Sequence, residues 1–177
     1  MVDSVAVALV PLGRDAIAAL ADDDLRNASE RCGLVLPQYF LDSTWRFLWR
    51  LRRQQLVEHP EDELWVAGAL VEVSSGNVVG HAGFHGAPDE RGMVEVGYAV
   101  APSFRGMGFG HGALRLLLER ASTEPLVEVV RASIAPANIA SRRIVERAGF
   151  TLVGSQIDEE DGLELVFELL AARIPHN

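Results

Sequence analysis

The stretch Met93–Leu118 constrains the fold of this chain more than any other part of the sequence. An alternating apolar run ends at Ala101-Pro102, a glycine-rich turn follows over Arg105–Gly110, and an amphipathic helix begins directly after it. A strand, a glycine loop and a helix in this order direct several free backbone N–H groups, and the positive end of a helix dipole, at one point. The stretch therefore predicts a binding site for a phosphate or pyrophosphate group.

Length and composition set the broad class of the protein. The 177 residues suit one domain, residues 1–177, and 49% hydrophobic with 23% charged residues is typical of a globular chain. No apolar run approaches the roughly 20 residues that cross a bilayer, and the N-terminal segment lacks a basic region, so we expect no membrane partner and no signal peptide. A single cysteine, Cys32, forms neither an intramolecular disulfide nor a zinc cluster. A cytoplasmic location is the default expectation.

The charge balance indicates which partners to expect. The formal net charge is −9, from 25 acidic and 16 basic residues. Nucleic-acid binding relies on a basic stripe, so we expect no nucleic-acid partner. The charge mildly favours a cationic substrate, although solubility alone also accounts for it. The acidic run Asp22–Asp24 is predicted to be a solvated helix start, because consecutive carboxylates on a helix point in different directions, and no metal site is expected.

Apolar periodicity predicts the secondary structure. Alternating or continuous apolar runs predict strands at Val5–Leu12, Leu64–Val73, Val78–Phe84, Met93–Ala101, Val127–Ile134, Phe150–Ile157 and Leu163–Leu169. Helical spacing predicts helices at Arg14–Ala21, Gln38–Glu58, Gly110–Ala121 and Asn138–Ala148. Ser75-Gly76-Asn77 signals a tight hairpin, and His59-Pro60 ends the second helix. These elements predict an α+β (mixed α/β) fold, in which two late helices cross a mostly antiparallel sheet.

Two common phosphate-binding loops do not fit the glycine-rich turn. A Walker A loop requires Gly-Lys-Ser/Thr at its end, whereas this chain has Gly110-His111-Gly112. The dinucleotide fingerprint requires glycine three residues after its second glycine, and the residue three past Gly108 is His111. The chain also lacks the repeated βαβ units of a dinucleotide-binding domain. A third kind of loop therefore has to be considered.

The loop resembles the pyrophosphate loop of acetyl-CoA-dependent N-acetyltransferases, the GNAT superfamily. Arg105–Gly110 matches the R/Q-x-x-G-x-G/A signature in full, and Asn138–Ser141 followed by Glu146–Phe150 is similar to the second signature of the superfamily. Glu95–Tyr98 resembles the branch that includes ribosomal-protein N-terminal acetyltransferases. The resemblance is specific from Leu64 to Leu169. It implies a GNAT-like central, mostly antiparallel sheet of about seven strands flanked by helices, with acetyl-CoA as cosubstrate and no metal.

The resemblance assigns a cofactor site. The glycines of the loop remove Cβ atoms where the backbone approaches phosphate oxygens, and Arg105 adds a charged fork. The strand before the loop is expected to pair its backbone with pantetheine. Asn138 also suits a plain helix N-cap, and Ser141 a small helix residue. The cofactor-binding residues implied are Ala99, Val100, Arg105, Gly106, Met107, Gly108, Phe109, Gly110, His111, Asn138 and Ser141.

The chemistry requires a neutral amine, so a lysine-like acceptor with a pKa of about 10.4 needs a general base. Glu95 occupies the strand position where many family members keep that base; a structural hydrogen bond or an anchor for the acceptor ammonium are equal alternatives. His85 is the rival base, but a solvent-exposed structural histidine is its expected state. Many relatives have a thiolate-protonating tyrosine seven residues after the motif asparagine, where this chain has Val145. The proton is then expected from water or from Ser141, the second predicted catalytic residue.

The acceptor is not identified by any motif. A protein N-terminus and a small-molecule primary amine both remain open, and a homodimer is possible. Trp45, Phe47 and Trp49 are expected in core or dimer packing rather than in the wall of an acceptor pocket. A non-catalytic acyl-CoA-binding regulatory domain is the alternative function, since it would keep the same loop. A nucleotide-binding module would bind ATP rather than CoA.

Overall fold

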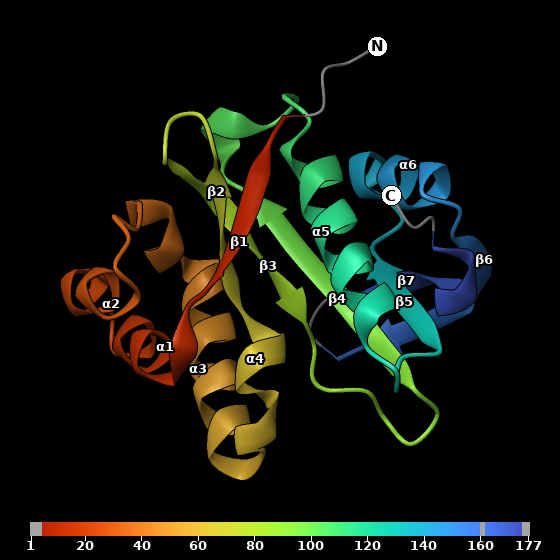
Figure 1. Cartoon of the computed structure of the whole chain (residues 1–177), viewed down its shortest axis with the longest axis horizontal. Helices are drawn as coiled ribbons and strands as arrows, with labels where there is room; N and C mark the ends of the chain where they lie inside the picture. Colours follow the sequence, from red (N-terminus) through yellow and green to blue (C-terminus); the bar gives the residue numbers. More distant parts are fainter. Residues whose placement is uncertain (1–4, 160–161, 175–177) are drawn as a thin grey trace.

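The computed structural model describes residues 5–159 and 162–174. Over these residues the chain forms a seven-stranded sheet in the order β1-β2-β3-β4-β5-β7-β6 (Figure 1). The pair β4–β5 is parallel and the other neighbours are antiparallel. The prediction of a mostly antiparallel α+β sheet is therefore confirmed. The strands are β1 Val7–Pro11, β2 Gly68–Glu72, β3 Val78–Phe84, β4 Met93–Val100, β5 Val129–Ile134, β6 Thr151–Asp158 and β7 Gly162–Leu170.

The helices gather in two groups. Figure 1 shows α1 to α4 together at one side of the molecule, and α5 and α6 at the other. Their bounds are α1 Gly13–Ala21, α2 Leu25–Cys32, α3 Ser43–Glu58, α4 Glu63–Val66, α5 Phe109–Thr123 and α6 Ile139–Arg147. Short 3-10 turns lie at Gln38–Leu41, Pro60–Asp62, Pro102–Phe104 and Ala171–Arg173. No helix among the described residues is long and apolar enough to cross a membrane.

Two predicted elements are divided in the structure. The segment predicted as one helix over Gln38–Glu58 is a 3-10 turn followed by α3, with Asp42 extended between them. This break lets Phe40 turn into the core, where its carbonyl accepts the Trp49 Nε1–H. The first part of the predicted strand Leu64–Val73 is α4, and Glu63 at the start of this helix accepts hydrogen bonds from the backbone and side chain of Arg14. The run Asp22–Asp24 does precede a helix, since Asp24 caps α2.

β4 separates from β5 partway along its length. Among the described residues the two strands pair over Met93–Glu95 and Val129–Arg131. From Val96 onward β4 pairs with β3 alone, so its other edge is free of a neighbouring strand. The predicted turn after β4 and the N-terminus of α5 lie at the open end of this gap. The divergence of the two strands thus places Glu95 at the point where the sheet opens.

Side chains of β4 alternate between two cores. Val94 and Val96 are buried in the core that contains Leu114 and Leu117 of α5. The opposite face of the sheet, where Glu95 projects, lies toward α3 and a second core built from α1, α3 and β2. The two faces therefore have different surroundings, with α5 on one side and α3 on the other.

A buried histidine lies on the α3 side of β3. His81 is 6% exposed, and the rings of Trp45 and Trp49 contact it edge-on with centroids 4.3 and 5.2 Å away. Burial, with a smaller contribution from the Arg52 charge, lowers the pKa of His81 from 6.5 to about 3. His81 is therefore neutral in the folded protein at neutral pH.

This histidine predicts acid sensitivity of folding. Because the folded pKa lies below the unfolded value of 6.5, the unfolded chain takes up a proton that the native chain does not, and stability falls as the pH drops from 6.5 toward 3. The loss is about 1.4 kcal/mol per pH unit. We expect urea unfolding of the wild type to lose about 2 kcal/mol more between about pH 7 and pH 5 than His81→Phe loses. Equal losses in the two proteins would contradict the prediction.

Candidate active site

A cleft of about 1100 Å³ opens where β4 and β5 diverge. The end of β4, the loop that follows it and the first turns of α5 and α6 line this cleft. All the predicted cofactor-binding residues except Met107 contribute to its lining; Met107 is 54% exposed and lies outside it. The residues that line the cleft are Ala99, Val100, Arg105, Gly106, Gly108, Phe109, Gly110, His111, Asn138 and Ser141.

The glycine loop presents a row of backbone donors. Gly106 and Gly108 have φ values of +76° and +91°, which side chains rarely tolerate. The N–H of Gly112 donates to the Gly108 carbonyl (3.1 Å), whereas the N–H groups from Gly106 to His111 have no acceptor among the described residues. Donors of this kind at the N-terminus of a 15-residue helix form a site for an anion.

The same cleft collects positive charge in a chain of net charge −9. Arg105 from the loop and Arg143 and Arg147 from α6 line it. Within the described part of the chain, no carboxylate lies within 4.0 Å of the nitrogens of these arginines. Arg105 Nε donates to the Val100 carbonyl (3.1 Å), which fixes the side chain beside the loop. The cleft is thus suited electrostatically to a ligand with several negative charges.

The free edge of β4 offers peptide groups to the cleft. The His85 N–H donates to the Glu95 carbonyl (2.8 Å) and the Ala101 N–H to the Val79 carbonyl (2.9 Å). Since backbone groups alternate between the two edges of a strand, odd-numbered residues of β4 bond to β3, and the groups of Tyr98 and Val100 point to the free edge. Ala99 therefore meets the cleft through its side chain, while Val100 and Tyr98 meet it through their peptide groups.

The N-terminus of α6 closes the cleft. Asn138 Oδ1 accepts the backbone N–H of Ser141 (3.1 Å), so Asn138 caps the helix as its residue type suggests. Ser141 itself lines the cleft. Val145, one turn further on, is fully buried and belongs to the core beneath the helix. α6 therefore presents a serine hydroxyl, and no phenol, at this end of the cleft.

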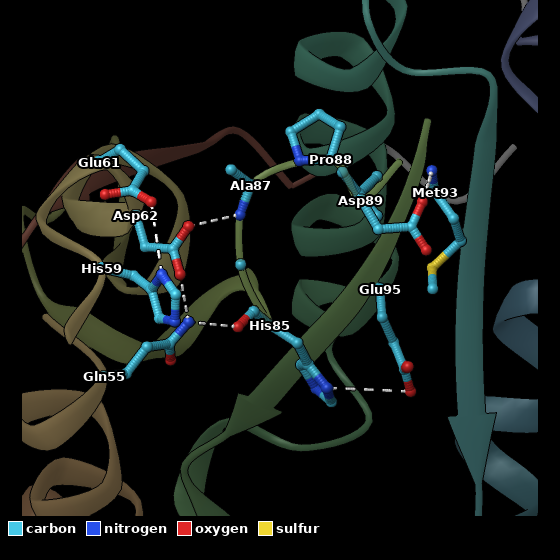
Figure 2. A pocket seen from close by; sticks show the side chains of 12 residues that line it. Gln55, His59, Glu61, Asp62, His85, Ala87, Pro88, Asp89, Met93 and Glu95 are labelled. Carbon is cyan, nitrogen blue, oxygen red and sulfur yellow. Dashed lines mark hydrogen bonds and ion pairs between the residues drawn. The ribbon is translucent and has the colours of Figure 1, made fainter. Parts of the chain in front are cut away.

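Glu95 lies in a second pocket, on the α3 side of the sheet. This pocket has a volume of about 420 Å³, and its floor is formed by Met93–Glu95 and the loop after β3. Figure 2 shows the side chains of Glu95 and His85 pointing toward one another, with His85 Nδ1 and Glu95 Oε1 3.9 Å apart. A Cβ atom at Gly97 would lie 3.3 Å from His85 Nε2, so the imidazole lies against Gly97, two residues before Ala99, which lines the first cleft.

The electrostatics of this pair favour a neutral imidazole. Burial lowers the pKa of His85; the Glu95 carboxylate opposes this shift, and the Arg52 guanidinium adds to it. The His85 side chain is 53% exposed at the mouth of the pocket, whereas the Glu95 side chain is 16% exposed. A neutral histidine beside a carboxylate can accept a proton and pass it to solvent. His85 and Glu95 thus form a pair able to act as a base.

α3 holds the wall of the second pocket in place. Arg52 and Gln55 both donate to the His85 carbonyl, at 2.9 and 2.7 Å. Asp62 accepts from Gln55 Nε2 (2.6 Å) and from the Ala87 N–H (2.8 Å), as seen in Figure 2. These bonds fix the backbone of the loop after β3, and so the position of the His85 ring.

Comparison with known proteins identifies the family. Residues 8–151 match the family described as the acetyltransferase (GNAT) domain. The chain belongs to this family. A curated relative, the uncharacterized N-acetyltransferase YjdG of Bacillus subtilis, is 31% identical over 100 residues, which are 56% of this chain and 60% of that protein. The aligned part therefore spans less than two thirds of the length of that relative.

Solved structures share the GNAT fold of this chain. Mycobacterium smegmatis RimJ in complex with CoA-disulfide has a TM-score of 0.67 at 21% identity, over 97% of this chain and 85% of that one. The ribosomal-protein-S5-alanine acetyltransferase of Vibrio fischeri gives 0.63 at 16%, over 96% and 94%. The dodecameric spermidine N-acetyltransferase of Vibrio cholerae gives 0.65 at 15%, over 94% and 95%.

The GNAT site includes residues that sequence reasoning did not assign. Trp45 of α3 and Tyr98 of β4 line the cofactor cleft, whereas Trp49 is fully buried and Phe47 is 49% exposed. Trp49 is thus a core residue, as expected, and Trp45 a wall of the cleft. Helical spacing groups these aromatics on α3, but it does not reveal that Trp45 reaches the end of β4.

Proposed function

We propose that this GNAT protein transfers the acetyl group of acetyl-CoA to a primary amine, by direct attack of the amine on the thioester. The observation that carries the proposal is the conjunction, in one cleft, of unbonded amides from Gly106 to His111, three arginines and a free strand edge. Coenzyme A has the matching parts: a pyrophosphate and a further phosphate for the amides and arginines, and two pantetheine amides for the peptide groups of Tyr98 and Val100.

Residues of one pocket would deprotonate the amine, and residues of the other would contact the leaving sulfur. The amine enters from the α3 side, where the His85–Glu95 pair takes its proton before or during attack on the thioester carbon. When the C–S bond breaks, the electron pair passes to sulfur, and Ser141 lies on the other side of the strand edge to interact with it.

The charges of the second pocket favour a cationic acceptor. Glu61, Asp62, Asp89 and Glu95 line it, and among the described residues no lysine or arginine does. Asp62 accepts hydrogen bonds from Gln55 and Ala87, and Asp89 accepts the N–H groups of Arg91 and Met93. Glu61, which lies 3.4 Å from His59 Nδ1, and Glu95 are the carboxylates that can attract an ammonium group. A spermidine N-acetyltransferase and a ribosomal-protein-S5-alanine acetyltransferase both occur among proteins of this fold. A panel that includes spermidine and a peptide with an N-terminal alanine would distinguish these acceptors.

Binding of CoA tests the proposal first. At about 100 times the dissociation constant, CoA is expected to stabilise the folded protein by about 2.7 kcal/mol, seen as a rise in Tm. Gly108→Val should abolish this rise, because φ at Gly108 is +91° and a branched side chain would occupy the phosphate position. Gly76→Val is the matched control, since Gly76 also has positive φ (+73°) but lies in the β2–β3 hairpin with no atom near its Cβ position.

The outcomes separate the possible ligands. A CoA-dependent rise retained in Gly76→Val and lost in Gly108→Val supports the cofactor site. An unchanged Tm with CoA, together with a rise with ATP or NAD, would refute it. CoA binding without turnover of any amine in the panel would leave an acyl-CoA-binding regulatory domain as the function.

A further inference from the structure

The chain buries a phenol beside the predicted position of the CoA sulfur. Tyr98 lies on β4 with its side chain on the α5 side, and it lines the cofactor cleft together with Ser141. Its hydroxyl oxygen is buried and has no hydrogen-bond partner among the described residues. A buried hydroxyl that makes no hydrogen bond of ordinary length destabilises the fold. Ser141 is the polar side chain that influences this phenol, and packing alone would be served as well by a phenylalanine.

Packing around the ring fixes where the phenol lies. A Cβ atom at Gly110 would lie 3.7 Å from Tyr98 Cε2 and 3.1 Å from Ile144 Cδ1. The ring thus lies beside the first turn of α5, near Ile144 of α6. Burial raises the pKa of Tyr98, and the nearby Ser141 hydroxyl lowers it to a smaller extent. The phenol therefore keeps its proton at neutral pH and lies close enough to Ser141 to interact with it.

We propose that Tyr98 is the proton donor for the departing CoA thiolate, and that the proton passes through the Ser141 hydroxyl. The inference rests on the proposed acetyl transfer. As the tetrahedral intermediate collapses, the C–S bond breaks and its electron pair goes to sulfur. Sulfur takes the proton of Ser141 Oγ, Ser141 takes the phenol proton of Tyr98, and the phenolate regains a proton from water. The proton removed from the amine leaves by way of the His85–Glu95 pair, so protons and charge balance.

Two physical arguments favour this relay over Ser141 alone. A serine hydroxyl that gave up its proton unaided would become an alkoxide, a far stronger base than a phenolate. Tyr98 is a stronger acid than serine, with an ordinary pKa of about 10 for a tyrosine, and so it can return a proton to Ser141 as Ser141 gives its own to sulfur. Burial raises the pKa of the thiol as well as that of the phenol, so transfer between two groups in the same cleft is not strongly opposed. The relay also supplies from β4 the phenol that α6 lacks at Val145.

Tyr98→Phe is the test, with Tyr39→Phe as its matched control. Tyr39 carries the other buried phenol without a hydrogen-bond partner among the described residues, but it does not line the cleft. We expect Tyr98→Phe to lower kcat by about 10²-fold, the low end for general acid catalysis. Its CoA-induced rise in Tm should stay that of the wild type. Tyr39→Phe should keep the wild-type kcat.

The selenium analogue of acetyl-CoA separates proton donation from a packing role. A selenolate is a much weaker base than a thiolate and leaves without a proton. With the selenium analogue as acetyl donor, the ratio of wild-type kcat to Tyr98→Phe kcat should therefore fall toward one. An equal deficit with both donors would overturn the inference, as would a wild-type kcat in Tyr98→Phe. The Tyr98→Phe, Ser141→Ala double variant should be no slower than the slower single variant, and additive losses would refute the relay through Ser141. A wild type that binds CoA but acetylates no amine would instead defeat the proposed function itself.

Discussion

Replacement of Glu95 by glutamine is expected to lower kcat by about 10²–10⁴-fold, the usual contribution of a general base. Affinity for CoA should stay nearly unchanged, because Glu95 lies in the pocket on the α3 side and does not line the cofactor cleft. The change removes the charge 3.9 Å from His85 Nδ1 that helps the pair to accept the amine proton. Steady-state kinetics with an established acceptor, together with a CoA titration, measure both quantities.

The pH dependence distinguishes the base from an anchor for the acceptor ammonium. If the pair acts as a base, the deficit of Glu95→Gln shrinks as the pH rises, since an amine that is already deprotonated needs no base. A deficit independent of pH would assign Glu95 to anchoring. Because burial holds the pKa of His85 below 6.5, the wild-type rate should fall on the acid side only below that value. Glu61→Gln is the control: it removes a charge from the same pocket and should raise KM for a cationic acceptor while sparing kcat.

Trp49→Ala is expected to lower the free energy of unfolding by about 3–5 kcal/mol, which is typical for removal of a buried large aromatic. Trp49 is fully buried, stacks on Phe40 at an interplanar angle of 8°, and donates from Nε1 to the Phe40 carbonyl at 2.7 Å. Its removal leaves a cavity beside His81 and a carbonyl without its donor. Urea denaturation at neutral pH measures the loss.

A conservative variant separates the contribution of the ring contact from that of the Nε1 hydrogen bond. Trp49→Phe retains most of the ring contact and removes the Nε1 donor, so a cost of about 1–3 kcal/mol is expected from the unsatisfied carbonyl. A loss below about 1 kcal/mol in Trp49→Ala would show that the second core does not depend on this ring.

The order of elements and the cofactor loop were predictable because they depend on local signals. Alternation over Val78–Phe84 and Met93–Ala101 fixed two strands to within a residue, and glycines in Arg105–Gly110 marked the turn before α5. α2 was missed, since Leu25–Cys32 is mostly polar and buries a single residue, Ala28. The split of Gln38–Glu58 depends on burial of Phe40, which is a tertiary contact and leaves no local trace.

The arrangement of the site depended more strongly on pairing between distant segments. Sequence alone placed Glu95 on the strand before the loop, but its contact with His85 follows from the β3–β4 register and from the bonds that Arg52 and Gln55 make to the loop. The same register determines that Tyr98, rather than Ala99, presents its peptide groups to the free edge. Resemblance to the family assigned backbone contacts to Ala99 and Val100. The alternation of backbone groups along β4 leaves this role to Val100, because the peptide groups of Ala99 bond to β3.

The short contact between β4 and β5 means that, on the proposed function, a bound cosubstrate would help to join the two halves of the sheet. One half of the sheet is β1 to β4 and the other is β5 to β7, and direct strand pairing joins them over Met93–Glu95 and Val129–Arg131. On the proposed function, a pantetheine arm along Tyr98 and Val100 would supply the missing rungs between the two halves. In each turnover, release of CoA would break these hydrogen bonds and binding of the next acetyl-CoA would form them again. The stability of the link between the two halves would then rise with the concentration of acetyl-CoA by mass action, so the reactant would also stabilise the sheet.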